Sequence, residues 1–152
     1  MCIRDSSDNL CGAAFVQSYS CDDDYAAIQL RSGHSLGHTF CTCTSGDSSA
    51  TGGPIYVRES KTWSEARAFC QGLGRDLVSI HSAAENSIVY TLIQDNWDHH
   101  SSQGTWPGTW IGFSDAAHEG TWTWSDGTPT DYVNFQAGEP NQGANENCGF
   151  FY

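Results

Sequence analysis

The sequence has few basic residues and no long apolar run. Lys and Arg together number 6, against 18 Asp and Glu, and the formal net charge is −12. Such a charge balance argues against a basic face that binds nucleic acid. No apolar stretch approaches the roughly 20 residues that a helix needs to cross a bilayer. We therefore expect no nucleic-acid partner and no membrane segment within this sequence.

No Cys-x-x-Cys pair is present either, which disfavours a zinc site built from thiolates. Seven cysteines in 152 residues are nevertheless many, and such a content is typical of proteins in an oxidising, extracellular setting. We expect disulfides and a secreted or cell-surface location. Cys11, Cys21, Cys41 and Cys43 lie near the amino terminus, and sequence does not choose among their three pairings.

The amino-terminal third differs in amino-acid composition from the rest of the chain. Residues 1–5 can be encoded by ATG TGT ATA AGA GAC, which resembles a sequencing adapter translated as protein, and we interpret them as a sequencing artefact. Residues 6–53 are rich in Ser, Gly and Asp, and we see no internal repeat. We therefore divide the chain into an unassigned Cys-rich extension, 1–53, and a domain, 54–152.

Regular patterns begin with a short strand predicted at 55–57. Thr62 and Glu65 form a capping box that starts a helix, and Gly74 is placed to end it. The apolar residues expected on the buried face of this helix are Trp63, Ala66, Cys70 and Leu73.

A second strand is predicted at 77–80, followed by a second helix. Ser82 and Glu85 form its capping box, and the pattern continues to about Gln94. Further strands are predicted at 110–113 and 121–124, before a long polar loop. The residues expected on the buried side of this helix are Ala84, Ile88 and Leu92, with Val89 and Ile93 widening the stripe.

The polar loop contains a group of hard oxygen ligands. Glu139-Pro140-Asn141 places a carboxylate and a carboxamide on either side of a proline. Glu146 and Asn147 follow, directly before a cysteine. Carboxylate and amide oxygens are the ligands that Ca²⁺ takes in proteins, so the loop is a candidate calcium site.

These motifs, with Trp110-Ile111-Gly112 and the segments 62–70 and 120–127, resemble a C-type lectin domain over 54–152. The resemblance implies an α+β fold with two helices, short antiparallel strands and a long calcium-binding loop. That fold normally closes when a final strand returns beside the first. We expect the domain to lack its closing C-terminal strands.

In the family, the order Glu-Pro-Asn goes with mannose-, glucose- and fucose-type sugars, and Gln-Pro-Asp with galactose-type sugars. The resemblance therefore assigns Glu139, Asn141 and Glu146 as ligands of Ca²⁺ and as contacts of a glycan. Two further ligands, an Asn-Asp pair, are expected beyond residue 152. The implied function is calcium-dependent, non-catalytic carbohydrate binding.

Some family members hold a second calcium ion. Asp115 and Glu119 match two of its ligands, with Glu146 and Asn147 nearby. Gln142 stands where an acidic or amide ligand is usual, so an ordinary solvated loop is an equal interpretation at this point.

Two more expectations come from the resemblance. Trp110, Trp122 and Trp124 are interpreted as core residues rather than platforms for sugar stacking. Cys70 and Cys148 correspond to the upstream partners of the two family disulfides, whose other cysteines are expected beyond residue 152. We therefore expect both to be unpaired in this chain.

Two alternatives stay open. One is a lectin-like module that binds protein without calcium. The other is a lectin-like domain fused to a degenerate metallopeptidase, because His34 and His38 have the i, i+4 spacing of a zinc peptidase helix. Ser35 occupies the place of the general-base glutamate, so such a peptidase would be inactive.

Overall fold

The computed structural model of the chain describes residues 16–19, 21, 40–45, 54–59, 61–96, 108–141 and 143–151. Helix α2 spans Trp63–Gly72, α3 spans Ala83–Asn96, and η1 is a short 3₁₀ helix at Gly143–Asn145. The strands of the described part are β1 Val16–Tyr19, β2 Phe40–Ser45, β3 Ile55–Arg58, β4 Arg75–Leu77, β5 Thr109–Ser114, β6 Thr123–Trp124 and β7 Cys148–Phe151.

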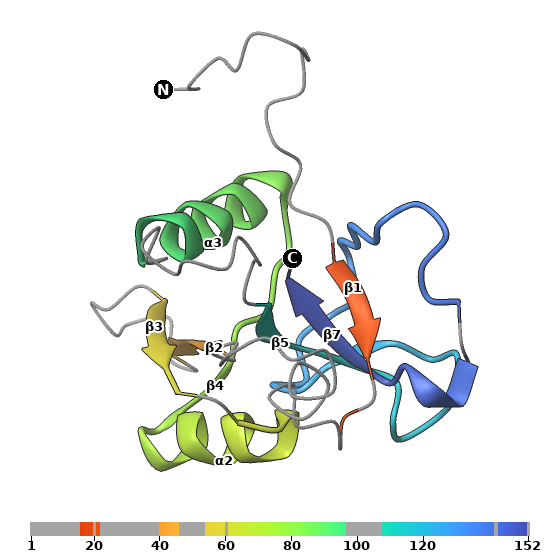
Figure 1. Cartoon of the computed structure of the whole chain (residues 1–152), viewed down its shortest axis with the longest axis horizontal. Coiled ribbons are helices and arrows are strands. Elements are labelled where there is room, and N and C mark those ends of the chain that lie inside the picture. Colours follow the sequence, from red (N-terminus) through yellow and green to blue (C-terminus); the bar gives the residue numbers. More distant parts are fainter. Residues whose placement is uncertain are drawn as a thin grey trace, which may run out of the picture.

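The strands form one sheet with the order β1-β7-β5-β2-β3, and β4 and β6 pair with β2 and β5. Only the β2–β5 pair is parallel among the described pairings. Figure 1 shows α3 on one side of the strands and α2 on the other. The predicted α+β class, with two helices and short, mostly antiparallel strands, is confirmed.

The core consists of two apolar clusters separated by the sheet. Successive side chains of a strand point to opposite faces, so β5 contributes to both clusters. Trp110 packs with Phe150 and with Ala66 of α2, whereas Ile111 and Phe113 pack with residues of α3. Each helix therefore covers one face of the same two central strands, β5 and β7.

The predicted core role of the tryptophans is confirmed. Trp110 is fully buried and Trp124 is 4% exposed. Trp122 is partly buried and contacts the ring of Phe113, with the ring centroids 5.2 Å apart.

Helix α2 begins and ends as the sequence predicts. The Thr62 hydroxyl accepts a hydrogen bond from the backbone N–H of Glu65, and the Glu65 carboxylate accepts one from the N–H of Thr62. Gly74 has a φ of +71° directly after the last turn, a conformation that favours glycine. The prediction for Leu73 is wrong, because this side chain is half exposed beyond the end of the helix.

The predicted buried face of α3 is confirmed only in part. Val89 and Ile93 are buried as expected, whereas Ala84 is exposed and Ile88 is 57% exposed, and the buried face turns instead toward Asn86. Apolar residues of α3 lie on more than one side of the helix, so periodicity alone does not decide which of them face the sheet. The Ser82 cap is confirmed, but the Glu85 carboxylate accepts its hydrogen bond from the N–H of His81.

The strand predicted at 77–80 is shorter and begins earlier, as β4. Val78 and Ile80 are buried although they lie outside a regular strand, and the carbonyl of Val78 accepts a hydrogen bond from the N–H of Gly112. The apolar pattern at these positions therefore indicates burial rather than regular strand pairing.

The amino-terminal extension contributes two strands to the sheet. β1 pairs with β7, and β2 pairs with both β3 and β5. Figure 1 shows β1 alongside β7, near the carboxyl end of the chain. One neighbour of β7 and the neighbour of β3 are thus strands from the amino-terminal third of the sequence.

The expectation of unpaired cysteines is wrong. Cys148 forms a disulfide with Cys21, across a sequence separation of 127 residues. Cys70 is disulfide-bonded as well. The physical reason is the packing of the extension, because β1 runs antiparallel to β7 and brings the following Cys21 to the start of β7.

Two further expectations concern a membrane segment and the peptidase alternative. No helix of the described part is long and apolar enough to cross a membrane. The histidines of the proposed peptidase remnant, His34 and His38, lie outside the described residues, so that interpretation stays a prediction.

Candidate functional site

Both ends of the predicted ligand loop are attached to the amino-terminal strand. At the start of the loop, the N–H of Gln136 donates to the carbonyl of Val16 at 2.9 Å. At its end, Cys148 is joined to Cys21. The ligand residues 139–147 therefore lie between two fixed points of the sheet.

Glu139 and Asn141 contact one another across Pro140. The peptide bond between Glu139 and Pro140 is cis. The Asn141 side-chain amide donates to Oε1 of Glu139 at 2.8 Å. The two side chains predicted to bind one ion and one sugar are therefore adjacent.

Glu146 joins this pair through the backbone. Its Oε2 accepts a hydrogen bond from the N–H of Asn141 at 3.1 Å, and its own N–H donates to the carbonyl of Gly143 in η1. Only 7% of Glu146 is exposed. The three predicted ligands, Glu139, Asn141 and Glu146, thus form one hydrogen-bonded chain with a buried carboxylate at its end.

Asp115 lies at the end of β5 and is 4% exposed. Its Oδ2 accepts a hydrogen bond from the N–H of Gly120 at 2.8 Å. Its other carboxylate oxygen, Oδ1, is buried without a hydrogen-bond partner in the structure. A buried oxygen of an acid costs free energy unless a donor or a cation satisfies it, so this atom is a candidate ligand position.

Glu119 and Asn147 lie near Asp115. The carbonyl of Asn147 accepts hydrogen bonds from the N–H of Asp115 and from the hydroxyl of Ser114, the latter at 2.7 Å. Oε1 of Glu119 lies 3.7 Å from the position that a Cβ atom on Gly143 would take. The structure therefore places Asp115 and Glu119 beside the segment that leads into Glu146.

Ser114 was not predicted as a site residue. Its hydroxyl accepts from the N–H of Ala116 as well as donating to Asn147, so it joins the turn after β5 to the start of β7. No sequence pattern distinguishes this serine from others at the end of a buried strand.

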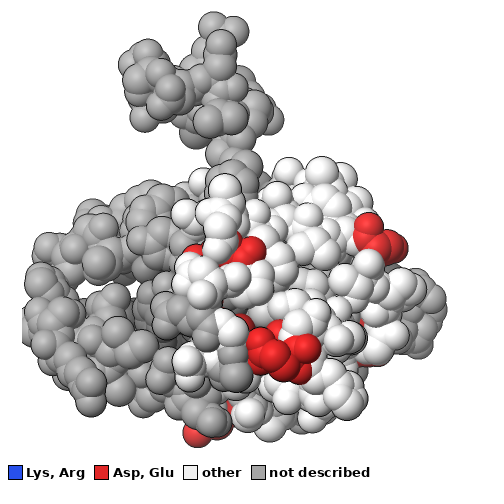
Figure 2. Space-filling model, turned by 90° about the vertical axis from the view of Figure 1, so that its right-hand side faces the viewer, with Lys and Arg blue, Asp and Glu red and all other residues white. Residues whose placement is uncertain are grey.

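The site lies in a strongly acidic part of the chain. No Lys or Arg follows Arg75 in the sequence. Figure 2 shows the face on the right of Figure 1, where acidic groups and no basic ones are visible among the described residues. No group of three or more His, Cys, Asp and Glu side chains positioned for a metal ion occurs in the described part, so any ion here must also use amide or backbone oxygens.

A second polar cluster lies near the start of α3, and its carboxylates accept hydrogen bonds from neighbouring side chains. Nδ1 of His81 lies 2.7 Å from Oδ1 of Asp131, and this hydrogen bond lowers the pKa of Asp131. Asp126 accepts hydrogen bonds from Ser79 and from Thr128. Burial acts to raise the pKa of Asp126, but these hydrogen bonds outweigh it and hold the pKa below its usual value.

Chemically, the loop offers a mixture of acceptors and donors on one short segment. Carboxylates accept and coordinate, and the Asn141 amide both accepts and donates. This combination suits recognition of a cation and of hydroxyl groups together.

Residues 59–151 match the family model described as "Lectin C-type domain", which covers more than half of the chain.

The chain belongs to the C-type lectin domain family. Members of this family are binding domains rather than enzymes, which confirms the prediction of a non-catalytic function. The matched residues contain the whole ligand loop together with α2, α3 and β5.

Relatives with this similarity come from several animals. The chain is 36% identical to ladderlectin of Oncorhynchus mykiss over 62% of this chain and 47% of the relative. It is 36% identical to a perlucin-like protein of Mytilus galloprovincialis over 64% of this chain and 60% of the relative. The galactose-specific lectin nattectin of Thalassophryne nattereri is 38% identical over 57% and 51%. The chain thus spans less than two thirds of these relatives.

Among solved structures, the carbohydrate-recognition domain of cow CD23, described in the presence of a GlcNAc2Man3 oligosaccharide, is 42% identical. The match covers 58% of this chain and 60% of that chain, with a TM-score of 0.46. The mouse scavenger receptor C-type lectin domain is 32% identical, with coverage of 57% and 61% and a TM-score of 0.45.

Proposed function

We propose that this domain binds mannose-, glucose- or fucose-type sugars through a calcium ion. The observation that supports this proposal best is the hydrogen-bonded chain of Glu139, Asn141 and Glu146. These three side chains combine two carboxylates and one amide on a loop that is fixed at both ends. The order Glu-Pro-Asn favours the mannose class over the galactose class.

The residues present fit a calcium ion. Calcium takes six to eight oxygen ligands, and carboxylates and amide carbonyls are its common protein ligands. Glu146 places a carboxylate where it is 7% exposed, in a region of the sequence without Lys or Arg. A buried anion in such surroundings is stabilised by an external cation.

Each ligand side chain has a second role toward the sugar. A bound calcium ion would supply a positive centre to which two neighbouring sugar hydroxyls present lone pairs. The Asn141 amide, which donates to Glu139 in the free domain, is then available to donate to one hydroxyl. The Glu139 carboxylate accepts the proton of the other hydroxyl. This division of donor and acceptor decides which pair of sugar hydroxyls fits.

We also propose a second ion beside Asp115. The buried Oδ1 of Asp115, the exposed carboxylate of Glu119 and the carboxylate of Glu146 are its candidate ligands, with Asn147 as a further one. The unsatisfied oxygen of Asp115 supports this assignment because a cation would remove the cost of burying it. We place the protein outside the cell, as a secreted or cell-surface lectin, and the disulfides of Cys148 and Cys70 support that location.

The test is binding of the full chain to immobilised mannose with calcium and with a chelator. We expect retention in calcium and release by the chelator. Glu59→Gln is the matched control, because Glu59 is an exposed carboxylate that pairs with Lys61 outside the loop. Equal retention in chelator would refute the calcium dependence, and a lack of retention in calcium would favour a lectin-like module that binds protein. One relative, 39% identical, is a mouse immunoglobulin epsilon Fc receptor, so that alternative has a precedent.

The sugar class has a separate test. The double substitution Glu139→Gln with Asn141→Asp exchanges donor and acceptor, and we expect the preference to shift from mannose toward galactose. Competition with free mannose and free galactose measures this shift. If the unaltered chain already prefers galactose, as the name of nattectin states for that relative, the mannose assignment is wrong.

A further inference from the structure

The amino-terminal strands occupy places in the sheet that are far from them in sequence. In the antiparallel pairing of β1 with β7, Val16 lies opposite Phe151 and Tyr19 opposite Cys148. The start of β1 therefore lies beside the end of β7. A chain that left β7 and turned back through a short connection would enter the position of β1 directly.

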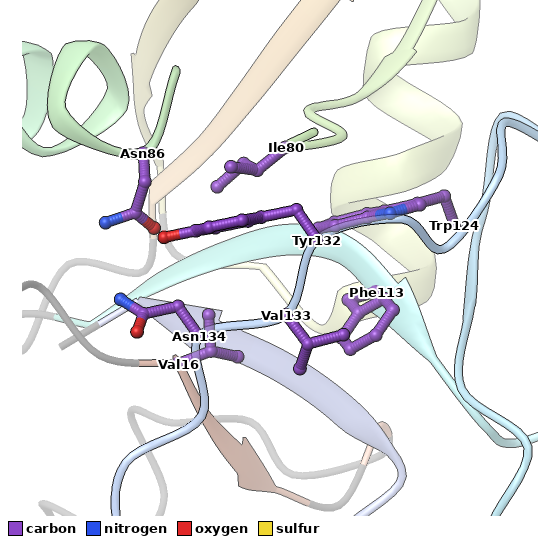
Figure 3. Close-up of a pocket in the computed structure, with 8 residues that line it drawn as sticks. All are labelled: Val16, Ile80, Asn86, Phe113, Trp124, Tyr132, Val133 and Asn134. Carbon is purple, nitrogen blue, oxygen red and sulfur yellow. The ribbon is translucent and has the colours of Figure 1, made fainter. Parts of the chain in front are cut away.

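Val16 is built into the core rather than resting on its surface. It is 4% exposed and belongs to the same apolar cluster as Phe113 and Ile80. Figure 3 shows Val16 beside Val133 and Asn134 at a small cavity under Tyr132. Its N–H donates to the carbonyl of Asn134 at 2.9 Å, so β1 is bonded on both of its edges.

The structure also draws attention to a short repeat that the sequence alone did not make evident. Two of the seven cysteines are followed by glycine, at 11–12 and at 148–149. In both places an aromatic residue stands four positions after the cysteine, as Phe15 and Tyr152. The first copy ends one residue before β1, and the second copy forms β7.

The glycine of this repeat has a structural reason at β7. A Cβ atom on Gly149 would lie 2.9 Å from both Cβ and the carbonyl oxygen of Phe113, which is closer than side chains tolerate. The Cys-Gly pair therefore marks a strand that packs closely against β5. The same Cys-Gly pair at 11–12 shares with β7 the cysteine and the glycine, and has alanines at 13 and 14 where β7 has Phe150 and Phe151.

We propose that residues 11–45 are the carboxyl-terminal segment of a second C-type lectin unit, of which 11–15 is the counterpart of β7. The edges of β7, β5 and β3 are then a docking surface for such a segment, and strands β1 and β2 of this chain occupy it. The disulfide between Cys21 and Cys148 closes this contact. The extension is thus part of a lectin fold and not a peptidase remnant.

The first test is disulfide mapping of the intact, oxidised chain by non-reducing proteolysis and mass spectrometry. We expect Cys148 to be joined to Cys21, within one chain or between two copies. Cys11 is the counterpart of Cys148 and holds the same place in its own unit, so it is not expected to be the partner of Cys148. A Cys11–Cys148 bond would overturn the proposal.

The second test is a circular permutant in which residues 16–45 follow residue 152 through a short Gly-Ser linker and the chain begins at Pro54. Paired residues in antiparallel strands are about 5 Å apart, so a linker of roughly two to four residues is long enough. The matched control has 16–45 scrambled, with its cysteines kept in place. Calorimetry of both and of the unpermuted chain gives the readout.

We expect the permutant to melt cooperatively and to keep the Cys21–Cys148 bond, while the scrambled control does not. A permutant that fails to melt cooperatively, or a control that melts as well as the permutant, contradicts the assignment. The disulfide map of the intact chain is independent of whether either variant folds.

Discussion

The carboxylates of this domain fall into two groups that differ in what satisfies them. Asp76 has Arg67 and the Ser125 hydroxyl as partners, and Asp131 has His81. The described contacts of the ligand carboxylates come instead from amides, such as the N–H of Gly120 on Asp115 and the N–H of Asn141 on Glu146. The first group is therefore satisfied by protein side chains, and we propose that the second is completed by an external cation.

The difference teaches that burial alone does not identify a ligand. Asp76 and Asp115 are both well shielded, the first within β4 and the second directly after β5. What separates them is the chemistry of the partner, because a guanidinium neutralises a carboxylate and a single backbone amide does not.

Asp76→Ala should have the largest effect, on stability. The Asp76 carboxylate accepts hydrogen bonds from the Arg67 side chain, the N–H of Leu77 and the Ser125 hydroxyl. Removing the carboxylate deprives these three donors of their common acceptor. We expect the free energy of unfolding to fall by about 2–4 kcal/mol, with and without calcium. Urea unfolding measures this loss of free energy. A loss of stability seen only in calcium would show that Asp76 belongs with the proposed calcium ligands. Glu59→Ala, at an exposed pair, serves as the control with little change.

Glu146→Gln should give the opposite pattern. The variant keeps an oxygen for the N–H of Asn141 but removes the buried charge. We expect calcium affinity to fall by at least about tenfold, because ligand charge sets the affinity of such sites. In chelator, the melting temperature should be unchanged or higher, since a neutral amide costs less to bury than a carboxylate. A variant that is less stable in chelator and binds calcium normally would show that Glu146 belongs to the structural group.

Asp115→Asn should have a smaller effect, on the number of ions. The amide oxygen can still accept from Gly120, so the turn is kept. Calorimetric titration with calcium should show the loss of one binding event while binding to mannose persists. An unchanged stoichiometry would contradict the second site. Asp126→Asn, whose carboxylate is satisfied by Ser79 and Thr128, should leave the stoichiometry as it was.

The smallest effect concerns acid. The pKa of Asp126 is below its usual value in the folded protein, so its stabilisation is present above the unfolded pKa of about 3.9 and is lost as pH falls through the folded pKa. Asp126→Asn should therefore flatten the dependence of melting temperature on pH below about pH 4. A slope identical to that of the unaltered chain would contradict the hydrogen-bond origin of the shift.

Local signals predicted the parts of the fold that depend on nearby residues. The capping box at Thr62, the glycine after α2 and the strand at 110–113 are each decided by a few neighbouring positions, and all three are confirmed. The orientation of α3 was missed because Ile88 and Val89 are both apolar and adjacent. Only contact with the sheet distinguishes them.

Long-range features were the least predictable. The Cys21–Cys148 disulfide and the pairing of β1 with β7 join residues more than a hundred positions apart, and no local pattern specifies such contacts. Glu139, Asn141 and Glu146 could be predicted as ligands because they stand close together in one motif, and the structure confirms only that they are hydrogen-bonded to one another. The hydroxyl of Ser114, which fixes the carbonyl of Asn147, has no comparable signal.

The most direct test of the account is the melting temperature of the full chain as a function of calcium concentration. Sites of this kind bind at about 0.1–1 mM, so 10 mM calcium should raise the free energy of unfolding by about 1.4–2.7 kcal/mol. We expect a rise of several degrees that chelator reverses and that Glu146→Gln reduces. A melting temperature that does not change with calcium up to 10 mM would contradict the claim that the loop carboxylates are completed by a cation.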